Sequence, residues 1–573
     1  MKVVIVGGVA GGASAAARLR RLDESAEIIM FERGEYISFA NCGLPYYIGG
    51  EITKKSALTL QTPQSFNARF NVDVRVNSEV TSIDPKAKTV TVRSKDRGEY
   101  TESYDKLILS PGAAPIRPPM EGADNARVFT LRNIPDTIKI REYVEEEFPA
   151  SAVVVGGGYI GVEMAENLKN AGVAVTIVEL ADHVIAPLDY DMACDVHRYL
   201  KEKGVGLILK NGVQAIKEEG GKLKLTLSDG EIETDMVIMA VGVRPDTALA
   251  KDAGLELNKR GAIVVNEHML TSDPDIYAVG DAVEVTDFVT GEKAYIPLAG
   301  PANKQGRIAA DNICGIPTTY KNTLGSAVLK IFDMTVATTG VNERAAKAAG
   351  LDYDKVYTYS NSHASYYPGS TGMSIKTLYE KGTGKILGAQ IVGFDGVDKR
   401  CDVLATAIRA GMTAKDLTEL ELCYAPPFGS AKDPVNFVGY VIENTLAGRV
   451  KNFFWDDVAK LPRDGSVTLL DVRTDLEREN GQYIEGFIHI PVDELRARAG
   501  ELDKSKPVYI HCRTGLRSYV ACCMLAGMGF DCYNLSGGWR LYESILSETK
   551  SPEHGCYDPN RGSISPESSW KNA

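Results

Sequence analysis

The chain has 573 residues, of which 44% are hydrophobic and 24% charged, a balance typical of a soluble globular protein with several domains. Its net charge of −12 argues against a general binder of nucleic acid or anionic membranes, so an anionic ligand would need a local basic patch. No apolar run approaches the ~18 residues of a membrane span and no export signal is recognisable, so we expect a cytoplasmic protein. The ten cysteines include no C-x-x-C pair and no metal-ligand spacing, which predicts reduced, mostly buried thiols and no metal site.

The first predicted element is a strand–glycine–helix unit in residues 2–22. A β-branched run leads into a turn with Gly7, Gly8, Gly11 and Gly12, and an alanine-rich helix follows. Such a turn places backbone N–H groups at a helix N-terminus, where they can bind a pyrophosphate. The next strand, EIIMFERG, ends at Glu32, whose carboxylate can accept hydrogen bonds from ribose hydroxyls.

A second unit of this kind begins at residue 151 and has the full G-x-G-x-x-G pattern at Gly156, Gly158 and Gly161. Glu179 ends its following strand, and a carboxylate there favours NADH over NADPH because it would repel a 2′-phosphate. One glycine motif alone could be a tight strand–helix turn. Two of them, each with its acidic residue, predict that the chain binds two dinucleotides.

Two further segments complete a recognisable order of motifs: a strand with a sharp turn at Ser110, Pro111 and Gly112, and TSDPDIYAVGDAVEV with Gly280 and Asp281. Over roughly residues 1–445 this order resembles the two-dinucleotide-binding flavoprotein disulfide reductase family. The resemblance implies an α/β protein with two Rossmann-like domains and an α+β dimerisation domain. It assigns FAD binding to residues 1–113 and 245–320, NAD binding to 114–244, and dimerisation to 321–445 of a homodimer.

The same resemblance implies which residues contact the cofactors. For FAD these are Gly7, Gly8, Ala10, Gly11, Glu32, Arg33, Ser110, Pro111, Gly112, Gly280, Asp281, Pro297 and Ala299. For NADH, with NADPH possible, they are Gly156, Gly158, Tyr159, Ile160, Gly161, Glu179 and Gly242.

Cys42, in YISFANCGLPYYIGG, is the first candidate for a reactive thiol. A typical disulfide reductase has two cysteines close together here, whereas the next cysteine in this chain is Cys194. A buried, inert thiol near a turn is the simpler interpretation. The fixed turn, the polar neighbours and the position after the FAD ribose strand favour a redox role. A single redox cysteine must pair with a small thiol or cycle through a sulfenate or persulfide.

The phrase SFANCGLPY resembles the coenzyme A disulfide reductase and NADH oxidase branch of the family. In that branch the cysteine forms a mixed disulfide with CoA, an anion. Arg18 and Arg21 lie three residues apart, hence on one helix face, and supply a basic patch, although a solvated face is the alternative. By resemblance, the CoA contacts are Ser14, Arg18, Arg21, Ser38, Asn41 and, from the other subunit, Lys432.

Two aromatic segments of the dimerisation domain, NSHASYYPGST and LCYAPPFGSAKD, contain tyrosines that would usually be packing residues. In the CoA-dependent branch, such tyrosines cross the dimer interface and donate hydrogen bonds near the reactive sulfur. We assign this role to Tyr366 and Tyr424, with Tyr367 as a rival for the first position. CYAPPFG stands where a glutathione-reductase-like enzyme would have a histidine, which disfavours that chemistry.

After a predicted linker at 446–462, alternating strands and helices in 463–550 predict a small α/β domain, followed by a flexible tail at 551–573 that contains Cys556. Cys512 follows a predicted strand and begins a loop that leads into a helix. The other loop residues are Arg513, Thr514, Gly515, Leu516 and Arg517. Backbone N–H groups there would stabilise a thiolate and hold an anion. A cysteine phosphatase would have one more residue in this loop.

The shorter loop, with LLDVRT before it and LSGGW after it, resembles a rhodanese domain, in which Cys512 would carry sulfur as a persulfide. A phosphatase or an inactive, binding-only rhodanese fold remains an alternative. Asp471 and Arg473 are expected to support the loop, and Cys522, Cys523 and Cys532 to lie in the core.

Together these features predict an FAD-containing, NADH-dependent reductase of CoA disulfide, CoA persulfide and related persulfides or polysulfides. Cys42 would be its redox centre and Cys512 would handle sulfane sulfur, with CoA as a substrate or a tightly bound carrier. Two alternatives stay open. One is an NADH oxidase or peroxidase that uses a Cys42 sulfenate, and the other is a sulfurtransferase or carrier with a regulatory flavin module.

Overall fold

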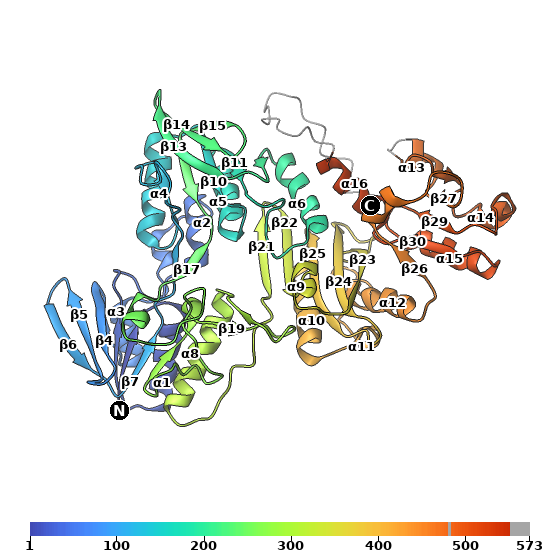
Figure 1. Cartoon of the computed structure of the whole chain (residues 1–573). Coiled ribbons are helices and arrows are strands. Elements are labelled where there is room, and N and C mark those ends of the chain that lie inside the picture. The colour runs from blue at the N-terminus through green and yellow to red at the C-terminus, as the bar shows by residue number, and fades with distance from the viewer. Residues whose placement is uncertain (480–482, 550–573) are drawn as a thin grey trace. The chain divides into compact units, whose positions relative to one another are not determined.

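The computed structural model describes residues 1–479 and 483–549, which form two compact units (Figure 1). The first unit contains residues 1–181 and 208–325, and the second contains 182–207 and the described residues from 326 onward. No helix in these described ranges is both long enough and apolar enough to cross a membrane. Cys556 and the tail predicted at 551–573 lie outside the described residues.

The N-terminal sheet of the first unit is parallel and holds the first predicted nucleotide motif. Its hydrophobic strands, Val3 to Val6 and Ile28 to Phe31 among them, are buried because helices cover both faces of such sheets. The strand order is β18 (Ile276–Ala278), β7 (Lys106–Leu109), β1 (Lys2–Val6), β2 (Glu27–Phe31) and β3 (Asp73–Arg75). Helices α1 (Ala10–Leu22), α3 (Pro63–Phe70) and α8 (Ala299–Ile313) accompany it, as does the antiparallel sheet β4 (Ser78–Asp84), β5 (Thr89–Ser94) and β6 (Gly98–Ser103).

A second parallel sheet in the same unit holds the second nucleotide motif. Its strands include β11 (Ala174–Val178), β10 (Ser151–Val155), β16 (Met236–Met239) and β9 (Val128–Phe129) in this order, and helices α4 (Ile134–Glu147) and α5 (Tyr159–Asn170) accompany them. An antiparallel sheet of β13 (Val213–Glu219), β14 (Lys222–Leu227) and β15 (Glu231–Thr234) packs its buried leucines against it.

The second unit begins with α6 (Tyr190–Glu202), which comes from within the predicted NAD-binding stretch. The predicted α+β domain has an antiparallel sheet in the order β21 (Ala327–Ile331), β22 (Met334–Gly340), β25 (Ile386–Gly393), β24 (Gly372–Glu380) and β23 (Tyr353–Asn361). Helices α10 (Val397–Ala410), α11 (Ala414–Glu419) and α12 (Pro434–Leu446) belong to this domain.

The C-terminal domain contains a parallel sheet ordered β26 (Lys451–Phe453), β30 (Cys532–Leu535), β29 (Val508–His511), β27 (Thr468–Asp471) and β28 (Ile488–His489). Its helices include α13 (Asp475–Glu479), α15 (Leu516–Gly527) and α16 (Gly538–Thr549). Strand β26 lies within the predicted linker 446–462, so part of that stretch is a strand of the sheet and not a connector. The predicted fold class, two Rossmann-like domains, an α+β domain and a small α/β domain, is confirmed.

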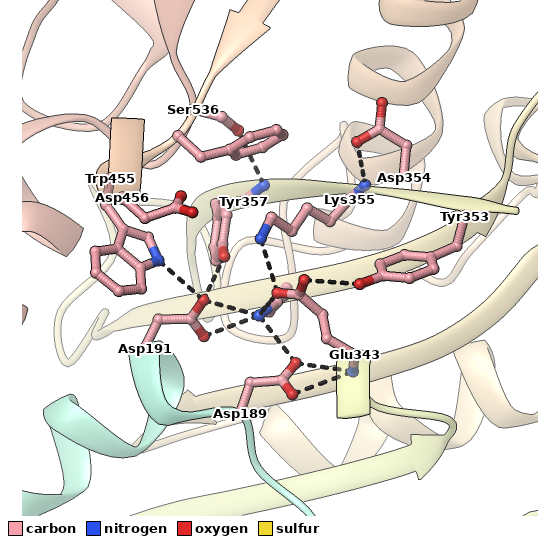
Figure 2. A network of polar contacts seen from close by, with 12 residues as sticks. Asp189, Asp191, Glu343, Tyr353, Asp354, Lys355, Tyr357, Trp455, Asp456 and Ser536 are labelled. Atoms are coloured by element: carbon pink, nitrogen blue, oxygen red, sulfur yellow. Dashed lines mark hydrogen bonds and ion pairs between the residues drawn. The ribbon is translucent and has the colours of Figure 1, made fainter. Parts of the chain in front are cut away.

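A buried polar network joins α6, the antiparallel sheet and the C-terminal domain within the second unit (Figure 2). Lys376 of β24 has no exposed surface, and its Nζ lies 2.9 Å from Asp189 Oδ2, 2.8 Å from Asp191 Oδ2 and 2.6 Å from Glu343 Oε1. Asp191 also accepts hydrogen bonds from Tyr357 and from the indole of Trp455. Three chain segments that are far apart in sequence therefore meet at one buried cluster of charged and hydrogen-bonding side chains.

Candidate functional site

The turn between β1 and α1 fits the phosphates of a dinucleotide such as FAD. Gly7 adopts φ +101°, and a Cβ on it would lie 2.0 Å from Ser110 O, so only glycine is accommodated. No side chain caps α1, which leaves its first N–H groups open to a ligand. The Glu32 carboxylate accepts from Gly8 N at 3.0 Å, which places it beside the turn where a ribose would lie.

The other predicted FAD residues lie in the same unit. Ala10 begins α1, Ala299 begins α8, and Pro297 precedes α8. Gly112 adopts φ +75°, and Gly280 N donates to the side chain of Gln305. The exposed Arg33 pairs with Asp246 at 2.8 Å. Burial raises the pKa of Asp281, and Arg132 lies 3.7 Å away and opposes that shift. The buried hydroxyl of Tyr295 has no partner among the described residues. An orphaned buried hydroxyl and a partly compensated carboxyl are consistent with a bound polar cofactor.

In the turn between β10 and α5, the three glycines of the G-x-G-x-x-G motif are needed for different reasons. Gly156 has φ +106°, and a Cβ on Gly161 would lie 1.9 Å from Gly156 O, so both glycines are required by the fold itself. A Cβ on Gly158 would meet nothing within 4 Å, so this glycine instead leaves room for a pyrophosphate. Glu179 accepts from Gly157 N at 2.6 Å, which places its carboxylate beside the turn. Tyr159 and Ile160 begin α5, and Gly242 has φ +107°.

Cys42 is exposed on a single 3₁₀ turn, Asn41–Gly43, directly before α2 (Leu44–Ile48). Partial burial of its sulfur, together with the carboxyls of Glu163 and Asp281, raises the thiol pKa, while Arg132 acts in the opposite direction. The Asn41 amide faces Arg132, where Oδ1 can accept from Nη1 at 3.1 Å. The thiol therefore lies among charged groups from three separate segments of this unit: α5, the turn at Asp281 and the segment before α4.

Sequence reasoning missed Glu163 of α5, which interacts electrostatically with Cys42. Burial raises the pKa of Glu163 to about 7, although the Tyr46 hydroxyl, 3.3 Å from Oε1, stabilises the ionised form. A carboxyl with this pKa can exchange a proton near neutral pH. Its position five residues after Gly158, on the helix that opens the second nucleotide motif, is the signal that could have identified it.

A cavity of about 410 Å³ lies at the predicted CoA patch. Ser14, Arg18, Arg21 and Ser38 line it as predicted, and Arg69 and Arg307 add two arginines that sequence reasoning missed. Arg18 pairs with Asp311 at 2.6 Å, whereas the other three arginines have no carboxylate partner among the described residues. Remaining lining residues are Ala13, Ala17, Gln61, Phe66, Phe70 and Asn303. The cavity is thus a local cationic site on an acidic protein.

Two predicted CoA contacts are not part of this cavity lining. Asn41 faces Arg132, as described above, and Lys432 is exposed in the second unit. Arg20, between the two predicted arginines, is buried and donates to backbone carbonyls, including Phe70 O and Ala26 O. It stabilises the fold of the cavity wall and does not face the ligand space.

Tyr366 and Tyr424 are both exposed, and their hydroxyl oxygens lie 3.0 Å apart. Tyr367 instead places its ring against His363, with ring centroids 5.8 Å apart. This geometry favours Tyr366 over Tyr367 as the partner of Tyr424. The hydrogen bond to Tyr424 raises the pKa of Tyr366, so Tyr366 retains its proton at neutral pH and can donate it in a hydrogen bond.

Cys512 lies at the start of the loop between β29 and α15, and it is fully buried. Gly515 N donates to its Sγ at 3.1 Å, and the Ser518 hydroxyl lies 3.3 Å from the same atom. Gly515 has φ +99°, which turns its N–H toward the sulfur. Such donors stabilise a thiolate or a terminal sulfur anion.

The surroundings of this loop are built as expected, apart from one cysteine. Asp471 and Arg473 are buried and paired at 2.8 Å, which supports the loop from below. Cys522 and Cys532 are buried, but Cys523 is exposed, so the prediction that it lies in the core is wrong. Successive residues of an α-helix point about 100° apart, and α15 turns only one of the two neighbouring cysteines inward.

Comparisons with known proteins identify the family to which each part of the chain is similar. Residues 1–306 match the pyridine nucleotide-disulphide oxidoreductase family, 326–434 match its dimerisation domain, and 454–544 match the rhodanese-like domain. The NADH oxidase of Methanocaldococcus jannaschii is 37% identical over 76% of this chain and 97% of its own length. The coenzyme A disulfide reductase of Staphylococcus aureus strain JH9 is 36% identical over 77% of this chain and 99% of its own.

Two solved structures cover nearly the whole chain. The reduced CoADR-RHD of Bacillus anthracis has a TM-score of 0.93 and 52% identity, covering 96% of this chain and 98% of that one. An NAD-dependent persulfide reductase from A. fulgidus has a TM-score of 0.89 and 40% identity, covering 95% and 100%. The chain therefore belongs to the pyridine nucleotide-disulphide oxidoreductase family, in a form that also contains a C-terminal rhodanese-like domain.

Proposed function

We propose that this protein is an FAD-containing, NADH-dependent reductase of CoA disulfide, CoA persulfide and related persulfides or polysulfides. The observation that carries the proposal is the combination, in one compact unit, of a single exposed thiol at Cys42 with a cavity lined by four arginines. The arginines suit the phosphates of CoA, and a lone redox thiol requires a small thiol or sulfur species as its partner. Coenzyme A disulfide reductase and persulfide reductase relatives support the same conclusion.

The proposed reaction at Cys42 balances as NADH + H⁺ + CoA persulfide → NAD⁺ + CoA thiol + H₂S. Cys42 Sγ attacks the CoA-linked sulfur, the S–S bond of the persulfide breaks, and its electron pair leaves with hydrosulfide. The resulting mixed disulfide between Cys42 and CoA is then reduced to two thiols. FAD, when bound, supplies the electron pair that originates from NADH. With CoA disulfide, the leaving group is a second CoA thiolate, and the electron count is the same.

Other residues of the chain have defined roles in this proposal. Glu163, with a pKa of about 7, can exchange the proton of the Cys42 thiol. In a homodimer, the hydroxyl pair of Tyr366 and Tyr424 would donate to the leaving thiolate, and Lys432 would reach CoA from the second subunit. All cysteines in the described ranges are free thiols, consistent with the reducing conditions of a cytoplasm.

The rhodanese-like domain extends the reaction to sulfane sulfur. Cys512 would receive a sulfur atom as a persulfide and pass that sulfur to CoA. A tightly held CoA could then carry the sulfur, as CoA persulfide, to Cys42. Denaturing the protein with and without a reductant, followed by mass spectrometry, tests this carrier role. Release of CoA is expected, and its absence in both redox states would contradict it.

An NADH oxidase is the second candidate, because the M. jannaschii relative is one and the same thiol could cycle as a sulfenate. NADH consumption should be compared with oxygen, CoA disulfide and polysulfide as the acceptor, with oxygen excluded from the last two assays. We expect faster turnover with the sulfur acceptors. Turnover with oxygen alone would establish the oxidase instead. If Cys512 is the sulfur entry site, a Cys512→Ser variant should lose turnover of polysulfide and of persulfides other than CoA persulfide. It should retain the reduction of CoA disulfide and of CoA persulfide, which react directly at Cys42.

A further inference from the structure

The arginine at the end of the Cys512 loop is engaged by a carboxylate. Arg517 Nη1 and Nη2 each lie 2.7 Å from an oxygen of Glu477, so the pair is bidentate. Glu477 also accepts from Thr474 N at 2.9 Å and from the Thr474 hydroxyl at 3.0 Å. Both partners are partly shielded, with 31% and 24% of their side chains exposed. Two hydrogen bonds therefore join Glu477 to the loop, and two more fix its side chain at the start of its own helix.

Glu477 remains an anion throughout the physiological range. Burial opposes its ionisation, but the hydrogen bonds from Arg517 and Thr474 outweigh that effect and bring its pKa to about 2. The carboxylate therefore cancels the charge of Arg517 at neutral pH, and a donor anion must compete with it for the guanidinium.

Of the other charged groups near the loop, two arginines share one carboxylate, Asp471. Arg473 is buried against Asp471, and Arg478 lies 3.8 Å from Asp471 while it donates to Phe487 O. His511 is buried, and burial lowers its pKa to about 4, so it is neutral. Arg513 is half-buried and has no ion pair among the described residues. Arg513, Arg517 and Glu477 by themselves thus carry one net positive charge, and without Glu477 they would carry two.

We propose that Glu477 is a specificity-determining residue that suits the Cys512 loop to a singly charged persulfide or polysulfide terminus and disfavours dianionic donors such as thiosulfate. The inference rests on the proposed sulfur-carrying role of Cys512. In the favoured step, R–S–S⁻ and the Cys512 thiol give R–SH and a Cys512 persulfide anion. The S–S bond of the donor breaks, a new S–S bond forms on Sγ, the thiol proton moves to the leaving thiolate, and no net oxidation occurs.

Glu477→Gln tests this inference because glutamine keeps an acceptor for Thr474 N and removes only the charge. Glu479→Gln is the matched control, since it removes one charge from the same short helix, at an exposed residue. The full-length holoprotein is incubated without oxygen with thiosulfate or with 2-mercaptoethanol persulfide, which carries a single charge, at low ionic strength. The one-sulfur mass increment on the Cys512 peptide is then followed over time.

We expect Glu477→Gln to load sulfur from thiosulfate about tenfold faster than the wild type and Glu479→Gln, because an opposing charge a few ångströms from the donor is gone. Loading from 2-mercaptoethanol persulfide should change much less. A second variant, Glu477→Gln with Arg517→Gln, should lose the gain, since the released guanidinium produces it. Unchanged thiosulfate loading in Glu477→Gln, an equal gain in Glu479→Gln, or a gain that survives in the double variant overturns the inference. Loading from neither donor in the wild type overturns the sulfur-carrying role of Cys512 itself.

Discussion

Replacing Lys376 by methionine should severely destabilise the second unit, because this lysine pairs with all three carboxylates of the buried network, Asp189, Asp191 and Glu343. Its ammonium is fully buried and contacts three carboxylates at 2.6–2.9 Å. Burial disfavours ionisation of Glu343, yet Lys376 and Lys355 bring its pKa down to about 2. Among the described residues, methionine would leave Asp189 and Asp191 without a lysine partner, and Glu343 with Lys355 and the exposed Lys347.

Breaking a buried ion pair by removing one partner costs about 3–5 kcal/mol. At an m-value of about 1–3 kcal/mol/M, the urea midpoint of the second unit should fall by more than about 1 M. Trp455 donates to Asp191 at 3.3 Å, so its fluorescence reports unfolding at the network. The loss should shrink as pH falls and the unpaired carboxylates take up protons. Lys381→Met, at an exposed lysine after β24, is the control and should cost less than about 0.5 kcal/mol. A loss below about 1 kcal/mol for Lys376→Met would refute the reasoning.

Three further predictions concern the first unit. Glu163→Gln should stabilise the protein by about 2–3 kcal/mol at pH 8 and remove a pH dependence of its stability. The Glu163 carboxyl keeps its proton up to about pH 7 in the folded protein and only up to about pH 4.5 in the unfolded chain. The free energy of unfolding of the wild type therefore falls as pH rises between these two values. Equal slopes of unfolding free energy against pH in both proteins would contradict this. Gly158→Ala should fold normally and weaken NADH binding in titrations, because its Cβ would meet no protein atom. Gly161→Ala should lower the free energy of unfolding by about 1–3 kcal/mol, because its Cβ would collide with the backbone of Gly156. Glu179→Ala should lower the ratio of kcat/KM for NADH to kcat/KM for NADPH in steady-state kinetics. An unchanged ratio would show that the Glu179 carboxylate does not determine the preference.

Features encoded by short local patterns could be predicted from the sequence. The glycine turns at Gly7 and Gly156 follow from spacing alone, because only glycine tolerates their backbone angles beside a neighbouring strand. The spacing of Arg18 and Arg21 placed both on one helix face, and both line the cationic cavity. The loop that begins at Cys512 was recognisable because strand, loop and helix are contiguous in the chain.

Features assembled from distant segments could not be predicted. Arg69 and Arg307 reach the cavity from α3's last turn and from α8, and nothing in either segment by itself indicates a shared ligand. Glu477 meets Arg517 from a separate helix, and Lys376 finds its carboxylates on two other elements. The short strand β26 was read as a linker because three residues carry almost no periodic signal.

The Cys42→Ser variant provides the most direct test of the central claim, that Cys42 is the thiol at which NADH-derived electrons reduce a CoA-linked sulfur. Sulfide release and NADH oxidation are measured together, without oxygen, with CoA persulfide as the acceptor. The account predicts that both fall at least about a hundredfold while NADH still bleaches the flavin absorbance, because the nucleotide-binding turns at Gly7 and Gly156 are unchanged. Sulfide release at the wild-type rate from Cys42→Ser would contradict it.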